Sequence, residues 1–237
     1  MNKNKYLAGL VGLAIGFGVA FYFTQKINRE GSSITTGQAS GIPGAAAGPG
    51  GQQAMMGQVQ QTIERAKSHP KDFDAQVDAA RVFFQISRAA ETVEYLERAH
   101  DIDPARFSEL KADALIGQHY AEQKKYAESE IWFNRAIKAE PGEAGLYVAL
   151  AETYVQREPP LPDRAIEQIQ LALKIDPKDG HALRHLIEAY ALKKDARAAE
   201  ETLKRLKETE PTSEDISKLE TLVADLKSGR PVTISKE

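Results

Sequence analysis

Apolar side chains recur three and four positions apart from about Gln52 to Lys227, with short polar turns between the segments. This spacing is typical of amphipathic helices. Five prolines punctuate the pattern at intervals of 34, 37, 36 and 34 residues: Pro70, Pro104, Pro141, Pro177 and Pro211. Each falls just beyond an expected helix, where proline is common because it cannot continue one. The pattern therefore predicts an all-helical repeat.

Other residues keep constant distances from these prolines. An aromatic residue follows three of them by thirteen positions: Phe83, Tyr154 and Tyr190. Tyr120 follows Pro104 by sixteen positions, which indicates an insertion of about three residues. Twelve positions before a proline lie Thr92, Ser129, Ala165 and Ala199. Eight positions before lie Leu96, Phe133, Ile169 and Leu203, and five positions before lie Ala99, Ala136, Ala172 and Leu206. Small residues let helices pack closely and large ones fill the space between layers, so these positions are the predicted core.

This order of residues at a period near 34 resembles the tetratricopeptide-repeat (TPR) superfamily. The resemblance implies an all-α fold, a superhelical α-solenoid of antiparallel helix pairs. The expected division is a half repeat at 54–69, repeats at 73–106, 110–143, 144–179 and 180–213, and a capping helix at 214–227. A solenoid needs such a cap because its last repeat would otherwise leave apolar surface open.

The N-terminal segment from Tyr6 to Phe23 contains no charged residue. As a helix it would be roughly 27 Å long, close to the thickness of a bilayer core. We expect a transmembrane helix at 6–25 after a short head at 1–5, with the C-terminal part outside the cytoplasm. A cleaved signal peptide is the alternative, with a weak small-residue site at 18–20. Bulky aromatic residues just beyond that site argue against cleavage.

One face of this segment carries small residues every fourth position: Ala8, Gly12, Gly16 and Ala20. Such spacing allows two membrane helices to approach closely, so a homodimer through this face is one hypothesis. Residues 28–53 are rich in Gly, Ala, Ser, Pro and Gln and are expected to form a flexible linker. Residues 228–237 are expected to be a disordered tail.

Composition narrows the function. The chain has 31 Lys and Arg against 34 Asp and Glu, with a net charge of −3, which argues against a nucleic-acid partner. The absence of Cys excludes disulfides, thiolate metal sites and a thiol nucleophile. His181 and His185 are four apart on one expected helix, but the HExxH pattern is missing and we predict no metal. We predict no catalytic residue, no cofactor and no enzymatic activity.

In the TPR family the first helix of each repeat lines a concave groove that holds a partner's peptide or helix. The groove positions that this resemblance implies are Asp74, Val77, Arg81, Phe84; Lys111, Gln118, Glu122; Val148, Glu152, Val155; and His181, Arg184, Glu188, Leu192. Val77, Phe84, Val148, Val155 and Leu192 would form an apolar binding patch if exposed. The Lys/Asn/Arg clamp of chaperone-binding TPR domains is missing at the corresponding positions.

The order of anchor, linker and repeats is similar to that of bacterial membrane-anchored TPR proteins, including the cytochrome c maturation type and the ancillary TPR subunit of the Sec translocon. It implies a single-pass protein of the inner membrane, a non-catalytic scaffold that assists assembly of a membrane or envelope complex. Two alternatives remain: a structural protein that self-oligomerises through its membrane helix, and a secreted TPR adaptor released by signal-peptide cleavage.

Overall fold

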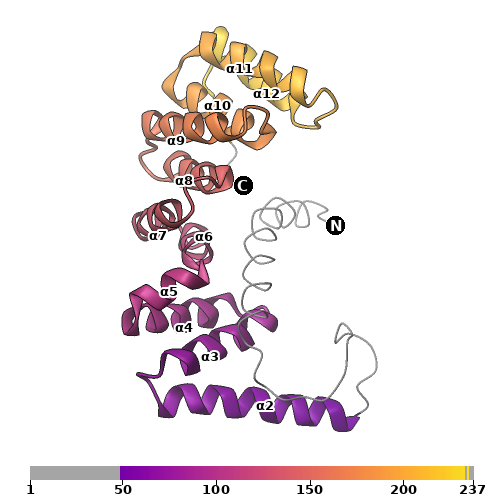
Figure 1. The fold of residues 1–237 in the computed structure, drawn as a ribbon. Helices are drawn as coiled ribbons and strands as arrows, with labels where there is room; N and C mark the ends of the chain where they lie inside the picture. Colours follow the sequence, from indigo (N-terminus) through magenta and orange to yellow (C-terminus); the bar gives the residue numbers. More distant parts are fainter. Residues whose placement is uncertain (1–48, 233, 235–237) are drawn as a thin grey trace. The chain divides into compact units, whose positions relative to one another are not determined.

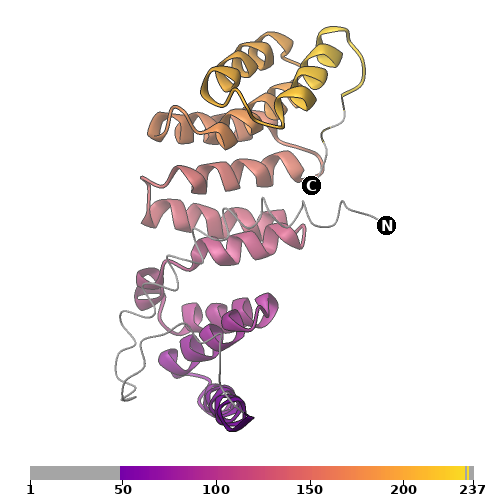
Figure 2. The ribbon, with the colours of Figure 1, turned by 90° about the vertical axis from the view of Figure 1, so that its right-hand side faces the viewer.

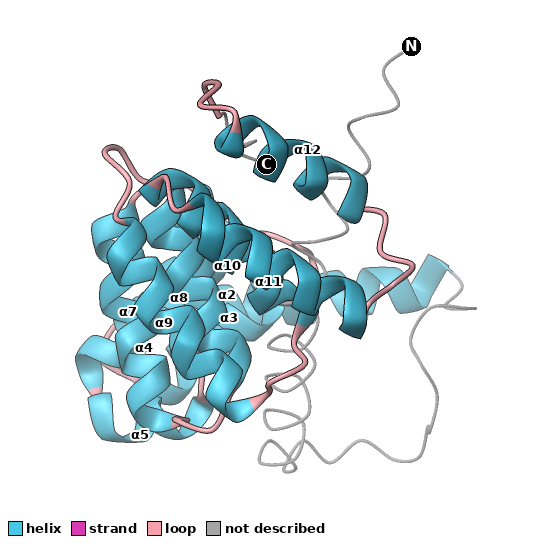
Figure 3. Cartoon of the chain, turned by 90° about the horizontal axis from the view of Figure 1, so that it is seen from above, coloured by secondary structure: helices cyan, strands magenta, loops and turns pink. Residues whose placement is uncertain are grey.

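The computed structural model describes residues 49–232 and residue 234, with side chains from Met56 onward. Every regular element in this range is an α-helix, which confirms the predicted fold class there (Figure 3). Across the same range, none of the helices has both the length and the apolar character of a membrane span. The head at 1–5, the predicted membrane helix at 6–25 and most of the linker lie outside the described residues.

The chain divides into two compact units, and among the described residues the boundary falls between His119 and Tyr120, inside helix α6 (Asp113–Glu122). The N-terminal unit begins with α2 (Pro49–Ser68), whose start lies within the stretch assigned above to the linker. Its other helices are α3 (Phe73–Gln85), α4 (Ala89–Ile102) and α5 (Pro104–Leu110) (Figure 1). Helix α3 packs on both α2 and α4.

After the last residues of α6, the C-terminal unit contains the second helix of one repeat, two complete helix pairs and the cap. Its helices are α7 (Tyr126–Ala139), α8 (Ala144–Gln156), α9 (Pro162–Ile175), α10 (Gly180–Lys193), α11 (Ala196–Thr209) and α12 (Ile216–Lys227). Each helix packs on the next, and α10 also packs on α8 and α12 (Figure 2). In a helical solenoid, each helix packs on the next one in the chain, and the first helix of a repeat also packs on the first helix of the following repeat.

The proline period marks the helix ends as predicted. Helices α2, α4, α7, α9 and α11 each end two residues before a proline of the series. The small and large residues at twelve, eight and five positions before these prolines are all buried. The sequence therefore identified the buried face of the second helix in each repeat, because these positions lie on one side of that helix.

An aspartate at the start of several helices explains where they begin. The carboxylates of Asp72, Asp103, Asp179 and Asp195 accept hydrogen bonds from backbone N–H groups in the first turn of α3, α5, α10 and α11. These caps satisfy donors that have no partner inside the helix. Turns between paired helices use left-handed residues at Ser87, Lys124 and Lys194.

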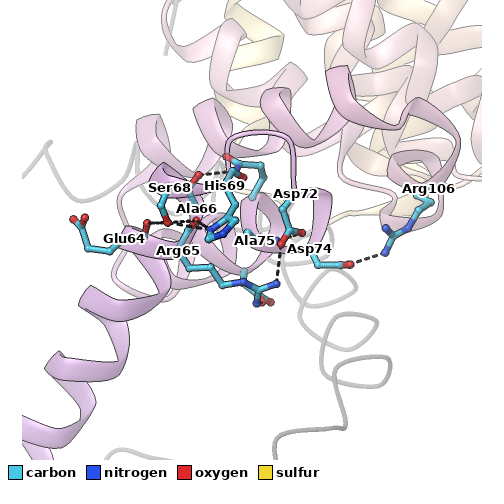
Figure 4. A network of polar contacts seen from close by, with 11 residues as sticks. Glu64, Arg65, Ala66, Ser68, His69, Asp72, Asp74, Ala75 and Arg106 are labelled. Carbon is cyan, nitrogen blue, oxygen red and sulfur yellow. Dashed lines mark hydrogen bonds and ion pairs between the residues drawn. The ribbon is translucent and has the colours of Figure 1, made fainter.

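Polar contacts join α2, α3 and α5 in the N-terminal unit (Figure 4). Arg65 of α2 binds Asp72 at 2.9 Å, and the backbone N–H of Ala75 donates to the same carboxylate. These two contacts hold the pKa of Asp72 below its usual value. Arg106 of α5 binds Asp74 of α3 at 2.6 Å, so the ion pair links the inserted helix to the first repeat.

Helix α5 is the feature that the repeat pattern did not predict. The insertion inferred after Pro104 belongs to this short helix, whose first turn is capped by Asp103. Lys111, predicted to lie on the groove face of a repeat helix, is instead the left-handed residue that ends α5. The physical reason is local, because Asp103 at the N-cap and Pro104 at the first helical position favour a new helix. A search for the constant spacing of TPR units does not detect such a start.

Candidate functional site on the first helices of the C-terminal unit

The structure separates the predicted groove residues of the N-terminal unit into paired, half-buried and buried side chains. Asp74 is exposed but paired with Arg106, and half-buried Arg81 binds Asp78 at 3.0 Å. Phe84 and Gln118 are half-buried, whereas Val77 belongs to the core. Glu122, at the end of α6 beyond the boundary, is exposed.

The predicted apolar patch is wrong for its three valines. Val77, Val148 and Val155 are only 5%, 1% and 8% exposed, too little to bind a partner. The two valines of α8 are buried because α8 packs against α7, α9 and α10 at once. Leu192 of α10 is half-buried and remains accessible.

Polar groove residues of the C-terminal unit do come together, around a histidine that was not among them. Nε2 of His185 lies 3.1 Å from a carboxylate oxygen of Glu152 on α8, and its Nδ1 lies 2.9 Å from Glu188 on α10. All three side chains are at most about a quarter exposed. We call Glu152, His185 and Glu188 the histidine cluster.

The surroundings of His185 keep its imidazole charged. Burial by itself disfavours the charged ring, but hydrogen bonds to Glu152 and Glu188 and their negative charges outweigh it and raise the pKa of His185 to about 10. A protonated ring donates through both nitrogens, which matches one carboxylate on each side. At neutral pH the cluster is therefore an imidazolium between two carboxylates.

Arg184, the residue before His185 on α10, forms a second network towards the end of the unit. Its Nη1 lies 2.9 Å from Glu210 and its Nε lies 3.5 Å from Asp215. Gly180 makes room for this arrangement, since a Cβ at that position would overlap the carboxylate of Glu210 as it is placed here. The network ties α10 to the end of α11 and the start of the capping helix.

His181 lies one turn before His185 and behaves differently. Burial and the positive charge of Arg184 lower the pKa of His181 below its usual value, so its ring is neutral at neutral pH. The His181–His185 pair lacks the geometry of a metal site, because both nitrogens of His185 face carboxylates. Across the described residues, no group of three or more His, Cys, Asp or Glu side chains is placed to hold a metal ion.

These residues form one polar surface with an excess of negative charge. Four carboxylates, those of Glu152, Glu188, Glu210 and Asp215, lie against three cations: Arg184, the protonated His185 and the exposed Lys218, which is 4.0 Å from Asp215. Half-buried carboxylates with lone pairs left over can accept hydrogen bonds from a peptide's backbone or from basic side chains. The arrangement suits binding better than bond-breaking chemistry.

His185 is the functional candidate that sequence reasoning missed. Its spacing to Glu188, three residues on the same helix, was a visible signal. Glu152 was indicated as a groove residue, but no spacing indicated its contact with His185, because it lies 33 residues earlier and meets His185 only through the packing of α8 on α10.

A profile of the tetratricopeptide repeat family matches residues 162–225, which cover α9 to α11 and most of α12. No curated protein matches the chain in sequence. Solved structures are similar in fold. MamA from Desulfovibrio magneticus RS-1 matches with a TM-score of 0.55 and 17% identity, over 84% of this chain and 99% of that one.

Two further solved structures show the same likeness. YrrB, described as a TPR protein with an unusual peptide-binding site, matches with a TM-score of 0.55 and 14% identity, over 87% of this chain and 97% of that one. A TPR protein from Parabacteroides merdae ATCC 43184 matches with a TM-score of 0.57 and 16% identity, over 66% of this chain and 60% of that one. Such low identities concern the fold alone, and together with the profile match they support the TPR superfamily.

Proposed function

We propose that this protein is a non-catalytic scaffold that binds a partner protein on the first-helix face of its C-terminal repeats. The observation that carries the proposal is the half-buried polar surface formed by α8, α10 and the start of α12. TPR proteins bind peptide or protein partners, and YrrB is a structural neighbour with a peptide-binding site. Interaction is thus the function that the fold favours.

The charge of this surface favours a basic peptide or helix as the ligand. The carboxylates of Glu152, Glu188, Glu210 and Asp215 outnumber the cations among them. Charge complementarity contributes to specificity and association rate more than to affinity. The half-buried leucine at position 192 would add an apolar contact beside the charged residues.

The test is site-specific photocross-linking in cells that express the full-length chain. A photoreactive residue at His181 or Leu192 should form reproducible adducts with one partner. The same residue at Glu208, an exposed position of α11, should not. Equal adducts from all three positions, or none from His181 and Leu192, would contradict binding on this face.

The charge preference has its own test. In the Glu152→Gln/Glu188→Gln double variant, adduct formation from Leu192 should fall, whereas Glu208→Gln should leave it unchanged. Unchanged cross-linking in the double variant would show that the partner does not need these carboxylates.

We also propose that the N-terminal segment tethers the scaffold to the inner membrane, with the repeats outside the cytoplasm, where it assists assembly of a membrane or envelope complex. Support comes from the uncharged run from Tyr6 to Phe23 and the Gly- and Pro-rich stretch after it. The full-length chain should sediment with membranes, whereas a chain lacking residues 1–27 should not. A reporter fused after Glu237 tests the topology.

The assembly role depends on a membrane partner. Pull-down from detergent extracts should recover the same membrane protein repeatedly, and failure to do so would remove the support for this role. A mature chain that begins near residue 21 and is released from membranes would favour the secreted adaptor instead.

A further inference from the structure

Two hollows occupy equivalent places in the two units. One, of about 420 Å³, lies between α9 and α11 over α10, and we call it the Thr202 pocket. The other, of about 480 Å³, lies between α2 and α4 over α3, and we call it the Tyr95 pocket. Each is bounded by two consecutive second helices and has the intervening first helix as its floor.

The repeat register relates most of the lining residues of the two hollows in pairs. Measured from the prolines of the series, seven positions line both hollows and correspond in pairs: Ile63 and Gln170, Lys67 and Lys174, Phe83 and Tyr190, Glu91 and Ala198, Glu94 and Glu201, Tyr95 and Thr202, Arg98 and Arg205. The lysine, the glutamate, the arginine and an aromatic floor residue are thus common to both. The hollows differ in the kind of side chain at three positions, where Tyr95 corresponds to Thr202, Ile63 to Gln170 and Glu91 to Ala198, and only the first of these differences removes an aromatic ring.

In the Tyr95 pocket the tyrosine completes a layered stack. Its ring lies on that of Phe83 with centroids 5.4 Å apart, and the guanidinium of Arg98 lies 4.8 Å from the centre of the Tyr95 ring. Arg98 also binds Glu94 at 2.5 Å. Stacked rings covered by a cation are mutually favourable, and here both cation and ring are satisfied within the chain.

In the Thr202 pocket the corresponding groups are left without these partners. Within residues 56–232, Tyr190 has no ring stacked on it, and no carboxylate pairs with Arg205 or Lys174. Glu201, the equivalent of Glu94, binds Arg197 instead at 3.1 Å. Buried Leu173 and Leu186 form an apolar lining beneath the two exposed basic side chains.

We propose that the Thr202 pocket receives an aromatic side chain from a separate partner protein, flanked in that partner by acidic residues. The ring would lie on Tyr190 where Tyr95 lies on Phe83, with Arg205 over its face as Arg98 is over Tyr95. The flanking carboxylates would pair with Lys174 and Arg205. In the first repeat, Tyr95 itself is the ring between the aromatic floor residue and the arginine. In the fourth repeat, a ring of the partner would take that position.

This surface is independent of the one proposed above. At about 100° per residue, Leu186 and Tyr190 lie on the side of α10 opposite to Arg184 and Glu188. The ligand chemistry also differs, because the Thr202 pocket offers positive charge and an aromatic floor. Either site can therefore fail its test without affecting the other.

The experiment titrates the ¹⁵N-labelled full-length chain in detergent with three synthetic peptides. The probe is Gly-Asp-Tyr-Asp-Gly, and its controls are Gly-Asp-Ala-Asp-Gly and Gly-Lys-Tyr-Lys-Gly. The probe should shift the amide signals of Ala198 to Arg205 and bind about tenfold more tightly than either control. Equal affinity of the probe and the alanine peptide would overturn the proposal.

Variants locate the site, and the internal equivalence supplies a matched control. Arg205→Glu should weaken the probe about tenfold, whereas Arg98→Glu at the equivalent position should leave its affinity unchanged. Thr202→Tyr, which restores the side chain of the first repeat, should abolish binding. Equal effects of the two arginine variants would refute the assignment, and so would tight binding to a folded Thr202→Tyr chain. Concentration-dependent line broadening without peptide that Arg205→Glu removes would mean that a second copy occupies the pocket.

Discussion

Replacing His185 by glutamine removes the positive charge that lies between Glu152 and Glu188. Glutamine is neutral at all pH values and can donate to both carboxylates only in a poorer geometry than the imidazolium. The two carboxylates, 24% and 26% exposed, would then face each other without a cation between them. We expect a loss of stability at neutral pH that decreases as the pH rises.

The magnitude follows from the pKa. A rise from 6.5 to about 10 corresponds to an upper bound of about 5 kcal/mol, at about 1.4 kcal/mol per pKa unit. Solvent around the half-buried carboxylates weakens the interaction, so we expect about 2–3 kcal/mol at pH 6 to 7.

The sign of the pH dependence is set by the direction of the shift. Because the folded protein holds the proton more tightly than the unfolded chain, the stabilisation is complete below about pH 6.5. It declines as the pH rises and is lost above about pH 10. The difference between wild type and His185→Gln should therefore shrink steadily between these values.

The direct assay is an NMR titration of the imidazole carbons in the full-length chain, with His185→Gln used for assignment. His185 should remain protonated at pH 8, whereas His181 should already be neutral at pH 7. Hydrogen exchange of α8 and α10 at pH 6.5 and 9.5 then reports the stability of this region, which is safer than one global midpoint because repeat arrays can unfold in parts. Titration of His185 near 6.5 would refute the reasoning.

Three further outcomes are expected. Asp179→Ala removes the acceptor for the Ala182 N–H, 3.1 Å away, and should cost about 1 kcal/mol, seen as faster hydrogen exchange in the first turn of α10. Phe133→Ala empties a core position that is 2% exposed and should lower the free energy of unfolding by about 3–5 kcal/mol in urea titrations. Replacing both Gly12 and Gly16 by leucine should abolish cross-linked dimers if the N-terminal segments pair, and unchanged cross-linking would exclude that hypothesis.

Much of the fold was accessible from the sequence because each second helix carries its own burial pattern. Leu96, Phe133 and Ile169 recur at one distance from a proline, and all three are buried. Such a period needs no knowledge of neighbouring helices, since one helix face determines it. Helix α5 escaped this reasoning because its seven residues are too few for a period to show.

The candidate site was accessible only in part. The family's groove spacing indicated Glu152 and Glu188, which the structure brings together around His185. The same spacing indicated Val148 and Val155, which the structure buries. Spacing along the sequence indicates on which face of its helix a side chain lies. It does not indicate whether a neighbouring helix buries that face.

The sequence by itself thus determined the helical repeats, their ends and the core face of each second helix, because these follow from local spacing and helix caps. Tertiary structure alone decided the charge of His185, which depends on a carboxylate 33 residues away on a packed helix. It also decided the contrast between the Tyr95 and Thr202 pockets, since the stack of Tyr95 on Phe83 forms only because α4 packs on α3. Electrostatic and packing energies depend on distances in space, and residues far apart in the chain set those distances.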